Sequence, residues 1–183
     1  MKNINIQEID DKTLQELKAG DSLLISGIIY TARDAAHKRM CDDFKNGKGF
    51  PFDIKGQAIY YAGPCPAKEG EVIGSCGPTT AGRMDAYTPL LLDNGLKIMI
   101  GKGGRDGAVK DAIIRNKALY LGAAGGLGAL ITSCIEKAEI IAYEDLGTEA
   151  IRKLWVKNFP CTVLLDTYGN DFYEQAKKLY KKA

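Results

Sequence analysis

The chain has 183 residues, of which 45% are hydrophobic and 26% are charged, and its formal net charge is +2 at pH 7. This composition is typical of a globular protein that buries a core, and so small a net charge argues against nucleic acid or an anionic membrane as a partner. The first ten residues do not resemble a signal peptide, and no apolar run is long enough to cross a bilayer. We therefore expect a single cytoplasmic domain over residues 1–183.

The cysteines and the histidine restrict the possible metal sites. The five cysteines are scattered and form no C-x-x-C motif, so the sequence supports neither a zinc ribbon nor a self-contained ferredoxin-type cluster. Free thiols in a reducing compartment fit this pattern best. His37 is the single histidine, which excludes a multi-histidine site, and we expect no metal ligand in this chain. The cysteines are Cys41, Cys65, Cys76, Cys134 and Cys161.

The chain opens with an alternating segment at 4–9, which predicts a short strand, and a helix-like segment at 11–17. An apolar run at 22–30 predicts a buried strand, and Thr31-Ala32-Arg33-Asp34-Ala35-Ala36-His37 follows it. Asp34 is predicted to cap a helix over 35–45, which places Arg33 where strand gives way to helix, a position where ligand-binding residues gather. Alternatively, Arg33 and Asp34 pair with each other and His37 lies on a solvated helix face.

The segment 74–85, with the sequence GSCGPTTAGRMD, combines adjacent hydroxyls, an arginine, an acid and three glycines. A helix is expected to start at Thr79 or Thr80, and Arg83 lies one turn after Thr79. A helix N-terminus, a hydroxyl and a guanidinium together suit a carboxylate or phosphate. The alternative is a capped surface helix in which Arg83 pairs with Asp85 or with solvent.

A glycine-rich loop, Gly101-Lys102-Gly103-Gly104-Arg105-Asp106, lies between a predicted strand at 96–100 and a predicted helix at 107–116. Glycines let an anion approach the backbone, and Lys102 and Arg105 supply positive charge. The loop matches neither the P-loop nor the G-x-G-x-x-G spacing. A tight turn with exposed basic residues remains the alternative.

A second glycine-rich segment, at 122–131, does not support a nucleotide site, because no acidic residue follows in the register that a dinucleotide requires. Small residues for close helix packing explain it better. Strands and helices alternate along the whole chain, so the fold class is α/β. The remaining strands are predicted at 57–62, 69–75, 118–121, 138–143 and 159–165, and the remaining helices around 83–94 and at 148–156 and 171–182.

The three motifs at 31–37, 77–85 and 100–103 occur in one order, and together they resemble the beta subunit of the iron–sulfur hydro-lyases, namely class I fumarase and L-tartrate dehydratase. The resemblance covers nearly the whole chain and includes the segments 56–64 and 138–147. It implies a swivelling β/β/α domain. It also implies an alpha subunit that binds a [4Fe–4S] cluster through three cysteines, with one iron open to the substrate, and an active site between the two subunits.

The resemblance also implies residue roles. Arg33, Arg83 and Lys102 match positions that bind substrate carboxylates, and fumarate, malate and tartrate are dianions that need at least two fixed positive groups. Thr79 matches the position proposed as the base that removes the C3 proton of malate, although a threonine hydroxyl needs help from its surroundings to do so. The supporting residues behind this substrate-binding set are expected to be Asp34, His37, Thr80 and Asp85.

The function that the resemblance favours is the beta subunit of a class I fumarate hydratase, active only with its alpha subunit in a heterodimer or heterotetramer. The same carboxylate clamp would serve an L-tartrate dehydratase that forms oxaloacetate. Two readings of other classes remain open. One is a non-catalytic module that binds phosphate or a nucleotide through the Thr79 and Lys102 loops, and the other is a scaffold for its partner.

Overall fold

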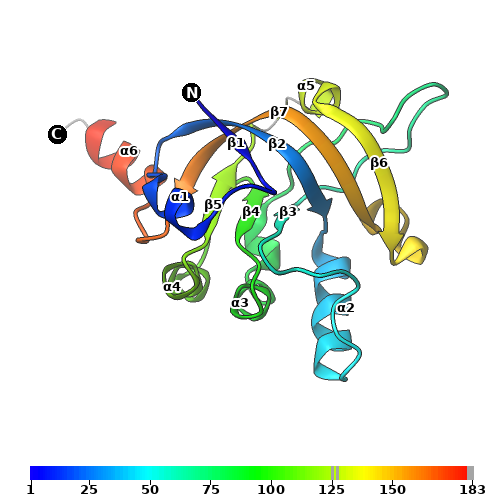
Figure 1. Ribbon diagram of the computed structural model, residues 1–183, viewed down its shortest axis with the longest axis horizontal. Coiled ribbons are helices and arrows are strands. Elements are labelled where there is room, and N and C mark those ends of the chain that lie inside the picture. The colour runs from blue at the N-terminus through cyan, green and yellow to red at the C-terminus, as the bar shows by residue number, and fades with distance from the viewer. Residues whose placement is uncertain (125, 127, 181–183) are drawn as a thin grey trace.

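The computed structural model describes residues 1–124, 126 and 128–180 (Figure 1). The strands are β1 (Lys2–Asn5), β2 (Ser22–Thr31), β3 (Ala58–Tyr60), β4 (Ile98–Gly101), β5 (Leu119–Gly122), β6 (Ile135–Ala142) and β7 (Ile151–Leu165). The helices are α1 (Asp11–Glu16), α2 (Asp34–Lys45), α3 (Thr88–Asp93), α4 (Gly107–Asn116), α5 (Gly128–Ser133) and α6 (Phe172–Tyr180), with 3₁₀ helices η1 (Ala81–Met84) and η2 (Glu144–Glu149). The predicted α/β class is confirmed.

The sheet closes on itself into a barrel-like arrangement. The strand order is β1-β2-β3-β4-β5-β7-β6, and β2 pairs with β7 in addition to β3. Strands β2, β3, β4 and β5 are mutually parallel, whereas β7 runs antiparallel to both β2 and β5 and so joins the two ends of the parallel group. Strand β6 extends the sheet beyond β7.

Side-chain alternation along the parallel strands produces two separate cores. On β4, Ile98 and Ile100 belong to a core that includes Tyr60, Leu121 and Phe159 on the other barrel strands. The intervening residue of β4, Met99, belongs instead to a core shared with the helices. That second core takes residues from three helices, including Met40 of α2, Leu91 of α3 and Val109 of α4. Figure 1 shows these three helices together on one side of the sheet. The fold therefore consists of two layers of strands, which enclose the first core, and one layer of helices, which covers the second core.

Two predicted elements are wrong. Residues 148–156, predicted as a helix, form the end of η2 and the start of β7. The apolar spacing of Ile151, Leu154 and Trp155 imitates a helix, but these residues pair with β2 and β6, and tertiary pairing overrides the local pattern. Residues 69–75, predicted as a strand, are turns and irregular backbone. The end of the closing helix predicted at 171–182 and two glycine-loop positions, 125 and 127, lie outside the described residues.

The parallel strands bring three connections to one edge of the sheet. Thr31 of β2 pairs with Tyr60 of β3, and Tyr60 pairs with Ile100 of β4. The residues that follow these strands, among them Arg33 and Lys102, therefore emerge at the same carboxyl edge, where ligands bind in open α/β sheets. None of the described helices is long and apolar enough to cross a membrane.

Candidate functional site at the carboxyl edge of the sheet

The loop containing Thr79 is held against the ends of β3 and β4 by backbone hydrogen bonds. The amide of Thr79 donates to the carbonyl of Tyr61 at 2.7 Å, and the amide of Lys102 donates to the carbonyl of Thr79 at 3.3 Å. The amide of Ala81 donates in turn to the carbonyl of Lys102 at 2.9 Å, and Thr80 and Lys102 form a parallel bridge. Two motifs that are separated by more than twenty positions in the sequence are thus adjacent in space.

The helix that the sequence predicts after Thr80 is only the four-residue 3₁₀ helix η1. Thr80 precedes it without a side-chain capping bond, so this segment does not provide the helix N-terminus that was predicted to bind an anion. Its contribution is the Arg83 side chain instead. Arg83 and Lys102 are both exposed, and neither forms an ion pair with another described residue. Two uncompensated cations therefore flank the Thr79 loop.

Arg33 lies at the N-cap position of α2, where β2 has just ended. Its Nη2 lies 3.3 Å from Oε1 of Glu149, and its Nε lies 3.7 Å from Oδ1 of Asp34. The stem of the side chain passes directly over Gly63, since a Cβ built on that glycine would lie 2.9 Å from Cδ of Arg33. The guanidinium is about three-quarters buried, with 24% of the side chain exposed. The predicted pairing of Arg33 with Asp34 is present, but Glu149 is a second partner.

Asp34 does not cap α2, because it is already the first residue of that helix. The side chain that does satisfy the first turn is Glu149, whose Oε2 accepts a hydrogen bond from the amide of Ala35 at 2.9 Å. Within the described residues, Oδ1 of Asp34 and Nε of Arg33 are both buried without a hydrogen-bond partner. These two atoms face each other at 3.7 Å, so they attract as an ion pair although neither has a hydrogen bond.

His37 is fully buried, contrary to the alternative that places it on a solvated helix face. Its Nδ1 lies 2.9 Å from the carbonyl of Arg33, which can only accept, so Nδ1 carries the proton. The ring packs edge-on against Tyr61, with 5.3 Å between centroids. Burial is the main cause that lowers the pKa of His37 to about 4; the backbone contact with Arg33 opposes this shift, and the charge of Arg105 adds to it. His37 is therefore neutral at physiological pH and braces the turn that carries Arg33.

Asp85 pairs with Arg105, not with Arg83. Nε of Arg105 donates to Oδ1 of Asp85 at 2.6 Å, and the amide of Asp106 donates to Oδ2 at 2.8 Å. The Arg105 side chain has no exposed surface, so the prediction that it supplies charge to a bound anion is wrong. Burial disfavours the charged guanidinium, but the Tyr61 hydroxyl and Asp85 outweigh this effect and raise the pKa of Arg105. Arg105 joins the two loops from beneath.

The sequence did not point to Glu149 at this edge, and it did not show the structural role of Arg105. Glu149 contacts α2 across 114 positions of sequence, and the segment around it was expected to be helical. No short-range spacing reports such a contact. Arg105 was recognisable as a basic residue in a glycine-rich loop, but only the fold shows that Tyr61 and Thr88 receive its hydrogen bonds.

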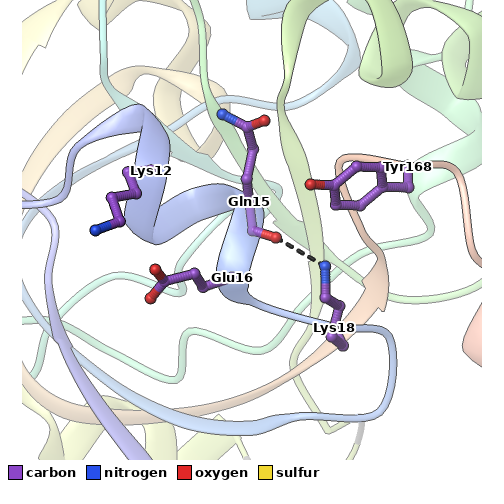
Figure 2. A pocket seen from close by; sticks show the side chains of 5 residues that line it. All are labelled: Lys12, Gln15, Glu16, Lys18 and Tyr168. Carbon is purple, nitrogen blue, oxygen red and sulfur yellow. Dashed lines mark hydrogen bonds between the residues drawn. The ribbon is translucent and has the colours of Figure 1, made fainter.

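The pocket in Figure 2 lies elsewhere, between α1 and the turn before α6. Lys18 donates from Nζ to the carbonyl of Gln15 at 2.8 Å, and its ammonium lies 4.1 Å from the ring centroid of Tyr168. These groups satisfy one another, and the lining includes none of the predicted site residues. The pocket is lined by Lys12, Gln15, Glu16, Lys18 and Tyr168.

An iron–sulfur cluster does not fit the donors of this chain. Within residues 1–124, 126 and 128–180, no three His, Cys, Asp or Glu side chains gather in a way that could hold a metal ion. Cys41 is buried in the core shared with the helices, Cys76 and Cys161 are buried in the barrel core, and Cys65 is exposed. Burial raises the pKa of the Cys76 thiol to about 12, which disfavours the thiolate that a metal requires.

Comparison with known proteins identifies the family. The chain matches the family described as "Fumarase C-terminus" over residues 1–176. It is 42% identical over 164 residues to the aerobic class I fumarate hydratase of Escherichia coli K12, covering 88% of this chain but 30% of that protein. It is 39% identical to the mitochondrial fumarate hydratase 1 of Leishmania major, covering 94% of this chain and 32% of that protein.

A shorter relative matches from end to end. The Methanocaldococcus jannaschii protein named "Putative L(+)-tartrate dehydratase subunit beta" is 35% identical over 182 residues, which are 96% of this chain and 93% of that protein. The chain thus spans about a third of the fumarate hydratases that it matches and nearly all of a beta subunit. By its match, its relatives and its fold, this chain belongs to the Fumarase C-terminus family of hydro-lyases, the family of class I fumarate hydratase and the tartrate dehydratase beta subunit.

Proposed function

We propose that this chain, as one domain over residues 1–183, is the beta subunit of a class I fumarate hydratase that interconverts fumarate and L-malate with an alpha subunit. The observation that carries the proposal is the cluster of cations at the carboxyl edge of the sheet. Lys102 pairs with Thr80, Arg83 follows in η1, and both are exposed, while Arg33 follows the end of the neighbouring strand β2. Such an edge suits a small dicarboxylate.

The substrate would be bound through its two carboxylates. A guanidinium can engage a carboxylate through two parallel hydrogen bonds, whereas the lysine ammonium acts as a point charge. Removal of the proton from C3 of malate places negative charge on the adjacent carboxylate, and fixed cations stabilise that charge as it develops. We assign this work to Arg33, Arg83 and Lys102.

Thr79 is our candidate for the group that accepts the C3 proton. Its backbone is fixed from both sides by Tyr61 and Lys102, so its side chain has a defined position at the edge. A threonine hydroxyl is too weak a base to act alone at neutral pH. A nearby cation would favour an anionic oxygen at this position, and we assign that part to Lys102, whose backbone is bonded to Thr79.

The partner and its cofactor belong to the proposal as well. One relative of the chain is named a subunit beta, and this name supports a separate alpha subunit that would supply the remainder of the enzyme. Because the donors of this chain do not fit a cluster, we place the [4Fe–4S] cluster on the alpha subunit. The part of this chain is then to bind carboxylates and to transfer a proton.

L-tartrate dehydratase is the second candidate, because one relative carries that name. The Methanocaldococcus jannaschii relative named as a putative tartrate dehydratase subunit beta is 35% identical to this chain over 93% of its own length. Tartrate carries one more hydroxyl than malate and would be dehydrated to oxaloacetate by the same carboxylate clamp.

The test is an anaerobic assay of this chain co-expressed with its alpha subunit, with L-malate and L-tartrate compared side by side. We expect fumarate from malate at a rate well above that of oxaloacetate from tartrate. A preference for tartrate would retain the clamp and change the substrate. Absence of turnover with either diacid, while absorbance at about 400 nm shows an intact cluster, would contradict the proposal and favour a non-catalytic anion-binding module.

A further inference from the structure

We propose that Glu149 is a positioning residue that orients the Arg33 guanidinium toward the substrate carboxylate. The inference rests on the proposed function and extends it to a residue outside the three motifs. Glu149 reaches the site from η2, which lies 114 positions away from the first turn of α2. One carboxylate thereby links the segment before β7 to the edge where the cations lie.

Each oxygen of Glu149 has a different partner. Oε2 accepts the hydrogen bond from the amide of Ala35 at 2.9 Å, and Oε1 lies 3.3 Å from Nη2 of Arg33. The first contact fixes the carboxylate relative to the helix, because an amide in the first turn has no partner within the helix itself. Through the second contact, the fixed carboxylate restrains the position of the guanidinium.

The rest of the Arg33 side chain is also confined. Gly63 lies against its stem, and a Cβ on that glycine would lie 2.9 Å from Cδ of Arg33 and 3.2 Å from the carbonyl of Thr148. The η2 backbone is itself held by Arg152, whose guanidinium donates to the carbonyls of Gly147, Thr148 and Ala150. The stem of Arg33 therefore lies against Gly63, and its guanidinium lies against Glu149.

This arrangement leaves donors for a ligand. Glu149 lies against Nη2 of Arg33, and Asp34 faces the buried Nε at 3.7 Å, so the two carboxylates hold two of the three guanidinium nitrogens. The side chains of Arg33 and Glu149 remain 24% and 21% exposed, so the pair is still reached from the surface. A guanidinium held in this way can present its remaining N–H groups to a carboxylate without first losing rotational freedom.

Two roles of Glu149 can be separated by substitution. In Glu149→Gln the amide oxygen can still accept from Ala35, so the contact that stabilises α2 is kept while the charge that holds Arg33 is lost. If Glu149 only stabilises the helix, Glu149→Gln is silent. If it positions Arg33, Glu149→Gln raises KM for malate and lowers kcat/KM by about tenfold, because a misplaced guanidinium both binds the substrate less well and stabilises the developing charge less well.

Asp145→Asn is the matched control. Asp145 also links η2 to α2, through two hydrogen bonds from Arg39 at 2.7 and 2.8 Å, but its side chain is 65% exposed and it does not contact Arg33. Both variants remove one charge from the same junction. We expect Asp145→Asn to leave KM unchanged in the assembled enzyme.

The decisive comparison adds Glu149→Gln to an Arg33→Ala background. A residue that acts through Arg33 has nothing left to position, so the second substitution should not lower kcat/KM further. A wild-type KM in Glu149→Gln, or a full additional loss in the double variant, would overturn the inference. An inactive wild-type complex would instead count against the proposed function, so the two failures are distinguishable.

Discussion

Asp85 accepts a 2.6 Å hydrogen bond from Nε of Arg105, and this contact joins the loop of Arg83 to the loop of Lys102 beneath the candidate site. The Arg105 side chain is completely buried and that of Asp85 is 11% exposed. Arg105 also donates to Oγ1 of Thr88 at 2.7 Å and to the hydroxyl of Tyr61 at 3.1 Å. A single guanidinium thus fixes the backbone that presents two exposed cations.

Replacing Arg105 should destabilise the protein strongly. Arg105→Met leaves Asp85 as a poorly solvated, unpaired carboxylate, and the loss of one partner from a buried ion pair costs about 3–5 kcal/mol. Urea unfolding of the purified chain measures this change. The control is Arg115→Met, which removes the Arg115–Asp93 pair at the surface, where the side chains are 48% and 44% exposed, and should cost no more than about 1 kcal/mol. Equal effects of the two substitutions would mean that the buried pair has no special structural role.

His37 gives a prediction about pH. Its pKa is about 4 when folded, mainly because the ring is buried, and its ordinary value is 6.5. Between these values the unfolded chain binds a proton that the folded chain does not, so unfolding takes up a proton and becomes easier as pH falls. From pH 7 to pH 5 the free energy of unfolding should decrease by about 2 kcal/mol.

The attribution to His37 can be checked directly, because the sequence contains a single histidine. Aspartates whose pKa is lowered in the folded state, such as Asp21 and Asp93, lose their contribution only as pH falls below their ordinary 3.8. Urea unfolding at pH 7, 6 and 5 should therefore show a slope in the wild type and almost none in His37→Gln. A slope that persists in the variant would assign the effect to other groups.

The sequence motifs predicted that the segments of Arg33 and Lys102 follow parallel strands, and parallel strands present their carboxyl ends at one edge. The alternation of strands and helices was enough to place Arg33 and Lys102 at that edge. It was not enough to reveal the barrel closure, because the closure depends on the long-range pairing of β7 with β2 and β5, which the local pattern of β7 does not show. The same limit hid Glu149, whose position depends on where β7 begins. Buried contacts such as Asp85 with Arg105 follow from packing, which composition does not report.

Gly63 should tolerate no side chain, although its backbone conformation is ordinary. An added Cβ would lie 2.9 Å from Cδ of Arg33 and 3.2 Å from a backbone carbonyl, so Arg33 must move. Gly63→Ala is expected to lower kcat/KM for malate by about tenfold or more, since misplacing a binding group by an ångström is enough to do so. Gly107→Ala is the control, because Gly107 faces open space and begins α4. Wild-type kinetics in Gly63→Ala would show that Arg33 does not need this path.

Thr79 should matter for kcat and not for folding. Its structural contacts are made by its backbone amide and carbonyl, so Thr79→Val keeps them and removes only the hydroxyl. We expect kcat in the assembled enzyme to fall by about 10²–10⁴, the usual contribution of a positioned proton-transfer group, with an unchanged melting temperature. Thr79→Ser should retain part of the activity. If Thr79→Val dehydrates malate at the wild-type rate, the proton acceptor is another residue.

The most direct test of the carboxylate clamp is the steady-state kinetics of Arg83→Met in the complex of this chain with its alpha subunit. Arg83 is exposed and forms no ion pair with another described residue, so its replacement should change the free energy of unfolding by less than about 0.5 kcal/mol. The account predicts that kcat/KM for malate falls by about 100-fold or more, because a charged hydrogen-bonding partner of the substrate is lost, while Arg115→Met stays at the wild-type value. A folded Arg83→Met complex with wild-type kcat/KM would contradict the account.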